Sequence, residues 1–325
     1  MIEKTNILVT GGAGFIGSNL VEVLLNDKRV GKVRVLDNLS NGFRHNIEEF
    51  MSNSDFELIE GDIMDYSTCV KACKDMDLVS HQAALGSVPR SIKNPISSDR
   101  VNIGGTLNMF NAVKDSDVKR IIFAASSSTY GDSESLPKVE HIIGRPLSPY
   151  GITKYVNELY ADVFGRTYDS FQFIGLRYFN VFGPKQDSRG AYAAVIPLFM
   201  QAALENRGPT INGDGSYSRD FTYVDNAVQA NIKALFTTNG DAINQIYNVA
   251  CAQRTTLNEL WSYIQEATNC NALAIHGANR MGDIPHSLAS IDKAKSKLGY
   301  NPEIKVKQGI VNTFNWSKSI KTTND

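Results

Sequence analysis

The chain has 325 residues, with 33 Lys and Arg against 34 Asp and Glu, which gives a formal net charge of −1 at pH 7. This balance excludes the basic footprint of a nucleic-acid-binding or membrane-surface protein. No apolar stretch approaches the roughly 20 residues of a membrane-spanning helix, and the first predicted strand is entered by Ile7, which leaves no room for a signal peptide. We therefore expect a cytoplasmic protein, and the length favours about two domains.

An apolar run at residues 6–10 gives way to glycines and then to apolar residues at helical spacing. This order predicts a strand, a turn and a helix. Gly12, Gly14 and Gly17 fit the spacing G-x-G-x-x-G, and Gly11, Gly14 and Gly17 equally fit G-x-x-G-x-x-G. Glycines at such a turn permit positive φ and let the backbone approach a pyrophosphate at the positive end of the helix. The segment therefore predicts a dinucleotide site.

A second predicted strand, residues 33–37, ends in Asp37, twenty residues after Gly17. A carboxylate at this distance accepts hydrogen bonds from the adenosine ribose hydroxyls and repels a 2′-phosphate. NAD is therefore favoured over NADP as the cofactor, while Arg34 and Arg44 nearby keep NADP open.

Strand-like and helical patterns alternate through the first half of the chain. The further predicted strands are residues 56–59, 77–84, 120–125 and 171–177, and the main predicted helices are residues 101–113, 150–168 and 225–236. Such alternation predicts parallel strands joined by crossover helices, that is, an α/β fold with a doubly wound Rossmann sheet.

From about residue 180 the pattern becomes shorter and more irregular, with prolines between the apolar segments. This predicts a smaller, mixed α/β domain that caps the carboxyl ends of the strands, where ligands bind in such sheets. Since the helix at 225–236 returns to the sheet, the division is discontinuous. We predict an NAD-binding domain of residues 1–180 plus about 222–250, and a substrate-binding domain of about 181–221 plus 251–325.

Tyr150 and Lys154 are four residues apart, so on a helix they share one face. A phenol is a poor base at its ordinary pKa of about 10, but a cation beside it favours the phenolate. The pair therefore predicts a proton-transfer group that works near neutral pH. A solvated helix surface explains the pair taken alone, and the dinucleotide signal upstream favours the catalytic interpretation.

The cysteines and histidines form no metal-binding pattern. Cys69 and Cys73 can share a helix face, but no further Cys or His completes a site, and Cys251 and Cys270 stand apart. His81 and His286 are isolated from these cysteines and from each other. We therefore expect no bound metal ion, and we expect the cysteines to be reduced thiols.

Eight motifs occur in an order that resembles the extended short-chain dehydrogenase/reductase family of nucleotide-sugar enzymes. They are residues 10–17, 37–39, 61–63, 81–84, Asn102, 126–131, 150–154 and 177–184. Within this family, residues 86–91, 190–197 and 211–215 are most similar to the UDP-hexose 4-epimerases, especially those acting on UDP-N-acetylglucosamine and UDP-N-acetylgalactosamine. The resemblance implies NAD-dependent 4-epimerisation through a transient 4-ketosugar, with UDP-glucose and UDP-galactose left open as further substrates.

The resemblance also implies catalytic roles. Tyr150 takes the proton from the sugar 4-hydroxyl, and Lys154 holds the nicotinamide ribose and lowers the pKa of Tyr150. Ser126 is the catalytic hydroxyl, although its neighbours Ser127 and Ser128 can substitute in the register, and Ser127 is expected to contact the sugar. A polar turn is the alternative for three serines in a row.

The cofactor residues implied by the resemblance lie in the same motifs, with Asp62 and Ile63 against the adenine and Asn102 near the ribose. A helix cap is the alternative for Asn102. The full set is Gly11, Gly14, Phe15, Ile16, Gly17, Asp37, Asn38, Asp62, Ile63, Gln82, Ala83, Ala84, Asn102, Ser126, Tyr150 and Lys154.

The substrate residues implied are Gly86, Ser87, Ser127, Tyr150, Asn180, Ala194, Val195, Asn212, Arg219, Arg280, Asp283 and Ser287. Arg219 and Arg280 match two diphosphate-binding arginines, whose guanidinium fork bonds two oxygens at once; ion pairs with the neighbouring acids are the alternative. Ser287 lies beside the sugar C2 substituent, where a small residue leaves room for an N-acetyl group. A one-residue slip would place His286 or Leu288 there.

Four other functions are compatible with the fold and the glycine turn. A 4,6-dehydratase has an acidic pair where this chain has Ser127 and Ser128, which counts against it. A UDP-glucuronate 4-epimerase or a decarboxylase needs a group for the sugar carboxylate, and Arg90 is the candidate. A non-catalytic NAD-sensing regulator has no use for Ser126, Tyr150 and Lys154.

The helices at 101–113 and 150–168 correspond to the pair that forms a four-helix dimer interface in members of the family. They carry more apolar residues than one face against the sheet requires: Leu107, Phe110, Val156, Leu159, Tyr160 and Val163. We therefore expect a homodimer.

Overall fold

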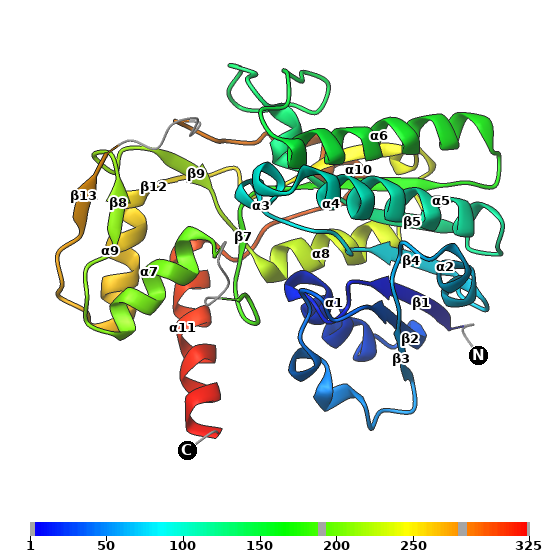
Figure 1. Cartoon of the computed structure of the whole chain (residues 1–325), viewed down its shortest axis with the longest axis horizontal. Coiled ribbons are helices and arrows are strands. Elements are labelled where there is room, and N and C mark those ends of the chain that lie inside the picture. The colour runs from blue at the N-terminus through cyan, green and yellow to red at the C-terminus, as the bar shows by residue number, and fades with distance from the viewer. Residues whose placement is uncertain (1–3, 188–192, 279–284, 324–325) are drawn as a thin grey trace.

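A computed structural model describes residues 4–187, 193–278 and 285–323, and its centre is a seven-stranded parallel sheet in the order β11-β6-β5-β4-β1-β2-β3 (Figure 1). The strands are β1 (Thr5–Thr10), β2 (Val30–Asp37), β3 (Phe56–Glu60), β4 (Leu78–His81), β5 (Arg120–Ser126), β6 (Phe173–Tyr178) and β11 (Gln245–Val249). The chain runs outward from β1 to β3 and then returns to β4 on the other side of β1. This reversal confirms the predicted doubly wound fold and places a ligand crevice at the carboxyl ends of β1 and β4.

Helices cover both faces of the sheet. Alternate side chains of β1 show the two layers, because Ile7 and Val9 pack with α1 (Phe15–Leu25) and α8 (Val224–Leu235), whereas Leu8 packs with the opposite layer. That opposite layer consists of α2 (Tyr66–Cys73), α5 (Thr106–Lys114) and α6 (Pro149–Thr167). With both faces covered, the central strands are continuous apolar runs rather than alternating ones.

A second group of elements lies beyond the ends of the strands, on the left of Figure 1. It contains α7 (Val195–Leu204), α9 (Leu257–Thr268), α11 (Val306–Thr323) and three two-stranded sheets: β7 (Val181–Phe182) with β10 (Thr222–Tyr223), β9 (Ser218–Asp220) with β12 (Arg254–Thr256), and β8 (Thr210–Asn212) with β13 (Ile275–Gly277). A capping box of Thr256 and Glu259 starts α9. The predicted domain boundaries stay a prediction.

The remaining elements are short. They are α3 (Val88–Lys93), α4 (Pro95–Asp99), α10 (Asp292–Leu298), the 3₁₀ turns η1 (Arg44–Asn46), η2 (Glu48–Phe50), η4 (Ser127–Tyr130) and η5 (Gly240–Ala242), and the π-helical turn η3 (Arg100–Gly105). Within the described ranges, no helix has the length and apolar character needed to cross a bilayer.

Two predicted elements differ in detail. The strand predicted at 77–84 ends at His81: the Gln82 amide still bonds to the Thr10 carbonyl at 3.0 Å, but the Ala83 amide reaches only the Thr10 side chain, at 3.3 Å, and the chain then leaves the sheet. The helix predicted at 101–113 begins with the wider turn η3, whose Asn102 is tied to the loop that follows β4.

Candidate active site

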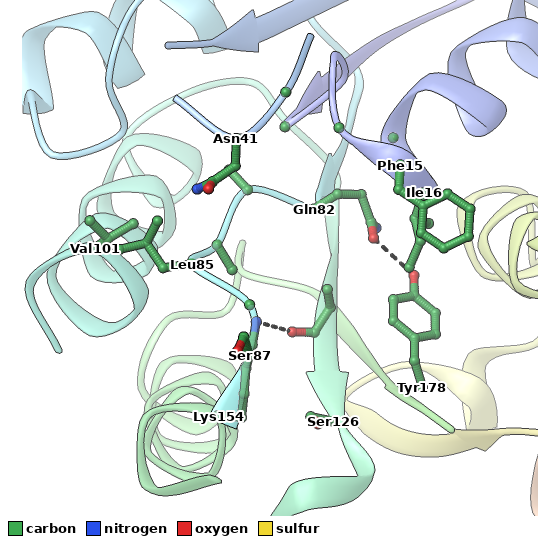
Figure 2. A pocket seen from close by; sticks show the side chains of 18 of the residues that line it. Phe15, Ile16, Asn41, Gln82, Leu85, Ser87, Val101, Ser126, Lys154 and Tyr178 are labelled. Atoms are coloured by element: carbon green, nitrogen blue, oxygen red, sulfur yellow. Dashed lines mark hydrogen bonds between the residues drawn. The ribbon is translucent and has the colours of Figure 1, made fainter. Parts of the chain in front are cut away.

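A cleft of about 520 Å³ opens at the carboxyl ends of β1, β4 and β5 (Figure 2). Predicted cofactor residues line it: Gly11, Gly14, Phe15, Ile16, Gly17, Asp37, Asn38, Asp62, Ile63, Gln82, Ala83, Ala84, Ser126, Tyr150 and Lys154. Four predicted substrate residues do so too, namely Gly86, Ser87, Ser127 and Asn180. The fold therefore brings together segments that lie up to 175 positions apart, from Gly11 to Gln186.

The glycine turn has space for a phosphate and for little else. Gly11 has φ +69°, and a Cβ added there would lie 2.7 Å from the Ala83 nitrogen. A Cβ on Gly17 would lie 2.1 Å from the Gly11 carbonyl oxygen, so the turn cannot close around a larger residue. Gly14 meets only that carbonyl, at 3.1 Å, and faces the cleft just before α1 begins at Phe15. Bare backbone at the positive end of a helix fits a dinucleotide pyrophosphate.

Asp37 is fixed at the end of β2, where its side chain turns into the cleft. Its Oδ2 accepts from the Ala13 amide at 2.9 Å and its Oδ1 from the Leu39 amide at 2.8 Å. Burial raises the pKa of the Asp37 carboxyl, and the two backbone hydrogen bonds oppose that rise. Neither arginine that kept NADP open lines the cleft: Arg34 donates to Glu57 at 3.0 Å, and Arg44 pairs with Glu60. The site therefore suits NAD.

Ser126, Tyr150 and Lys154 meet at one end of the cleft, where Figure 2 labels Ser126 and Lys154. Helix α6 presents Tyr150 in its first turn, because Pro149 starts the helix and Ser148 caps it through the Gly151 amide. Lys154 donates from Nζ to the Ala124 carbonyl at 2.7 Å and lies 6.0 Å from the centre of the Tyr150 ring.

Burial sets the main electrostatic effects on this triad. Burial raises the pKa of the Tyr150 phenol, and a hydrogen bond with Ser126 opposes that rise. Burial lowers the pKa of the Lys154 ammonium to about 8, while the nearby Glu158 carboxylate opposes that fall. The Ser126 hydroxyl thus favours the phenolate, and the predicted effect of Lys154 on the Tyr150 pKa stays a prediction. Its Oγ also accepts from the Ser128 amide at 3.1 Å, which holds it at the end of β5.

Asn102 does not line the cleft but supports one of its walls. Its Oδ1 accepts from the Leu85 amide at 2.7 Å, and its Nδ2 donates to the Leu85 carbonyl and to Thr153 Oγ1, both at 3.1 Å. The fully buried amide therefore fastens the loop after β4 to α6. Asn102 therefore neither caps a helix nor lies on the cleft surface.

The predicted residues of the second group of elements are not among those that line this cleft. Ala194 and Val195 are at the start of α7, Asn212 ends β8, and none of them lines it. Arg219 on β9 donates to the Ser218 carbonyl at 3.0 Å and to the Pro285 carbonyl at 3.2 Å.

Ser287 lies beside β9, because its amide donates to the Ser218 carbonyl at 3.0 Å. Ser287 therefore lies close to Arg219. The residue is half-buried. Arg280 and Asp283 lie outside the described residues, as do residues 190–192 of a quoted motif.

Sequence reasoning missed several lining residues, among them Asn41, Tyr178 and Gln186. Tyr178 ends β6 and donates to Gln82 Oε1 at 3.1 Å, the dashed contact in Figure 2, while Asn231 Nδ2 donates to the Tyr178 hydroxyl at 2.7 Å. The quoted 177–184 motif contained Tyr178, but only the neighbouring strand ends show where its hydroxyl lies.

His81 is part of the scaffold below the cleft. Its Nδ1 lies 2.7 Å from Thr10 Oγ1 and its Nε2 lies 3.0 Å from Thr106 Oγ1. Burial lowers the pKa of the His81 imidazole to about 3, so the ring is neutral at physiological pH. Across the described ranges, His, Cys, Asp and Glu side chains form no cluster of three that could hold a metal ion.

Comparisons with known proteins agree with this geometry. Residues 7–250 match the NAD dependent epimerase/dehydratase family. The chain is 38% identical to the UDP-N-acetylglucosamine 4-epimerase from Methanobrevibacter ruminantium M1, solved in complex with UDP-N-acetylmuramic acid, with a TM-score of 0.91 over 98% of this chain and 99% of that one. A UDP-glucose 4-epimerase of Mycolicibacterium smegmatis is 33% identical over 96% of this chain and 98% of its own length. The UDP-glucuronic acid 4-epimerase from Bacillus cereus, in complex with UDP-glucuronic acid and NAD, is 30% identical, with a TM-score of 0.88 over 97% of this chain and 100% of that one.

Proposed function

Because this chain belongs to the NAD dependent epimerase/dehydratase family, we propose that it is a UDP-sugar 4-epimerase that interconverts UDP-N-acetylglucosamine and UDP-N-acetylgalactosamine. UDP-glucose and UDP-galactose are secondary substrates in this proposal. The observation that carries it is the meeting of Ser126, Tyr150 and Lys154 at one end of a cleft whose other parts fit a dinucleotide.

The residues divide the chemistry between them. Tyr150, as the phenolate, accepts the proton of the sugar 4-hydroxyl and becomes a phenol, and the Ser126 hydroxyl stabilises the phenolate beforehand through the hydrogen bond that opposes the burial-induced rise of its pKa. Lys154, fixed on the Ala124 carbonyl, holds the nicotinamide ribose and adds a positive charge beside the phenolate. NAD, held by the residues that line the cleft, would supply the hydride acceptor and donor for C4. A diphosphate held in place would let the 4-ketosugar present either face of C4, so no second base would be needed.

Arg219 supports the anchoring of the diphosphate. Its contacts with the Ser218 and Pro285 carbonyls place a guanidinium next to the segment that carries Ser287. A guanidinium bonds two phosphate oxygens at once, and a fixed diphosphate lets the hexose rotate without leaving the site. We extend this role to Arg280 on the resemblance alone.

Ser287 supports the preference for N-acetylated hexoses. A serine beside the sugar C2 leaves room for an acetamido group, and its hydroxyl can donate to the acetamido carbonyl. The 38% identical structure from Methanobrevibacter ruminantium, described as a UDP-N-acetylglucosamine 4-epimerase, agrees with this preference.

UDP-glucuronate is the second candidate substrate, since the Bacillus cereus enzyme acts on it. Arg90, the group proposed for a carboxylate, donates to Asn41 Oδ1 at 2.6 Å. Figure 2 shows Asn41 at the opposite end of the cleft from Ser126 and Lys154. This position favours the acetylated hexoses, because the sugar must lie at the Tyr150 end.

The specificity test compares turnover of UDP-N-acetylglucosamine, UDP-glucose and UDP-glucuronate, separated from their 4-epimers by HPLC. We expect the acetylated sugar to be turned over fastest. Ser287→Tyr should abolish its turnover by steric exclusion and leave UDP-glucose turnover measurable. Equal loss for both substrates, or no loss, would show that Ser287 does not line the sugar pocket; fastest turnover of UDP-glucuronate would select the second candidate.

We also propose a homodimer through α5 and α6, which lie side by side in Figure 1. On α6, Leu159, Tyr160 and Val163 are exposed by 49%, 37% and 48%. Phe110, predicted to share this surface, is instead fully buried against Phe123 and its neighbours. The exposed α6 side chains support the proposal.

A further inference from the structure

A buried ion pair lies behind the catalytic residues and takes no part in the mechanism above. Arg177 donates from Nε to Glu158 Oε1 at 2.8 Å and from Nη2 to Glu158 Oε2 at 2.7 Å. The two side chains are only 2% and 5% exposed. Removing two charges from water is costly, and an apolar pair of similar volume is often as stable. The pair is therefore weak evidence for stability and points to another role.

Glu158 joins the segments that carry the catalytic groups. It lies one turn after Lys154 on α6, so the two side chains share a face. The single proton of the Thr129 hydroxyl is donated mainly to the Ser126 carbonyl, at 2.7 Å, and is shared with Glu158 Oε1, at 3.4 Å. Arg177 belongs to β6, directly before Tyr178 in the cleft wall. One carboxylate thus connects the Ser126 turn, the Tyr150 helix and the end of β6.

The charges around Lys154 make Glu158 its main electrostatic partner. Burial lowers the pKa of the Lys154 ammonium, and Glu158 opposes that fall. From β4, the neutral His81 imidazole faces Lys154 and supplies no negative charge, and from β5 the Ala124 carbonyl accepts a hydrogen bond from Lys154 Nζ. Tyr150 lies on the same helix, and Arg177 on β6 is cationic and directed at Glu158.

We propose that Glu158 is a positioning residue of the 4-epimerase reaction: it holds the positive charge on Lys154 and, through Thr129, sets the Ser126 turn against α6. This inference rests on the proposed function, because it assigns no role to Glu158 without the catalytic roles of Ser126 and Lys154. Glu158 itself lines no part of the cleft.

The first test removes the link to Ser126 and leaves the ion pair intact. Thr129→Val replaces the hydroxyl of a fully buried side chain with a methyl group of similar size. We expect kcat to fall about tenfold, as for the loss of one hydrogen bond that orients a reacting group, while KM for the UDP-sugar and the NAD content of the purified protein stay unchanged. A wild-type kcat in this variant would overturn the link through Thr129.

The second test follows the pH dependence of kcat. Glu158→Gln should move the alkaline limb to lower pH by about one unit, because Lys154 loses the charge that keeps it protonated. Glu158→Gln combined with Arg177→Met removes both charges of the ion pair and leaves no unpaired charge at positions 158 and 177, so it keeps the test intact if the single variant fails to fold. The same downward shift is expected. A limb identical to that of the wild type in the folded double variant would show that the pair is only structural.

Asp162→Asn is the matched control, since Asp162 lies one turn further along α6 and forms an exposed ion pair with Arg166 at 2.6 Å. Its pH profile should equal that of the wild type. If the wild type is active and the Glu158 and Thr129 variants have its kcat and pH profile, this inference alone is contradicted. An inactive wild type would overturn the proposed function, and this inference with it.

Discussion

The phenol of Tyr150 is the group on which the proposed chemistry depends most. Tyr150→Phe removes one hydroxyl from a helix that Pro149 and Ser148 still start and cap, so fold and NAD content should survive. Turnover should fall by about 10²–10⁴, the usual contribution of general base catalysis. The measurement is kcat against UDP-N-acetylglucosamine with NAD content determined in parallel. A Phe variant with nearly wild-type turnover would remove Tyr150 from its role.

The neutral imidazole of His81 makes stability depend on pH. Its folded pKa of about 3 lies below the ordinary value of 6.5, so the stability it contributes is fully present above pH 6.5 and is lost as the pH falls toward 3. From pH 7 to pH 5 the loss is about 2 kcal/mol in the free energy of unfolding.

His81→Gln keeps hydrogen-bonding groups near Thr10 and Thr106 but does not titrate in this range. Urea unfolding at both pH values should therefore show a smaller pH-dependent loss in the variant than in the wild type. An equal pH-dependent loss of stability in both proteins would contradict the low pKa of His81. Only the difference between the two pH values is compared, because the substitution also changes stability at neutral pH.

At the scale of elements, the turn between β1 and α1 decides whether a dinucleotide binds. A Cβ at Gly17 would meet the Gly11 carbonyl oxygen at 2.1 Å, so Gly17→Ala should displace the turn and the start of α1. We expect the purified variant to contain little NAD. Gly240→Ala is the matched control, because nothing lies within 4 Å of a Cβ at that position. Equal NAD contents for both variants and the wild type would show that the turn does not bind the cofactor.

The elements that could be predicted are those with a local signal. Apolar runs and glycine spacing predicted the parallel sheet, the turn at Gly11–Gly17 and the carboxylate of Asp37, since each depends on residues close in sequence. The π-helical turn η3 was not predicted, because a helical apolar pattern does not distinguish a π turn from an α turn. The end of β4 was placed too late, because a strand ends where its neighbours do.

The residues of the candidate site also divide into those with a local sequence signal and those without one. Tyr150 and Lys154 could be predicted from their spacing, and Ser126 from a motif. Tyr178 and Gln186 line the cleft only because β6 lies next to β5 in the sheet and β7 follows β6, and no local pattern contains that adjacency. The bond between Arg177 and Glu158, 19 positions apart, is invisible to the sequence for the same reason.

For the whole molecule, the exposed apolar face of α6 predicts a dimer. Light scattering at micromolar concentration should give a mass near twice 35.8 kDa. Leu159→Glu together with Val163→Glu places charges on that face and should shift the mass toward the monomer, since burying unpaired charges is costly. A monomeric wild type would refute the proposed assembly.

The fate of the hydrogen on C4 tests the proposed epimerisation most directly. Purified protein is incubated in water with UDP-N-acetylglucosamine carrying deuterium at C4 of the sugar, and the product is examined by NMR and mass spectrometry. We predict UDP-N-acetylgalactosamine with the deuterium retained at C4, because the hydride is returned to the carbon from which it was taken. Loss of deuterium to solvent, a dehydrated product, or no conversion by protein that contains NAD would contradict the proposal.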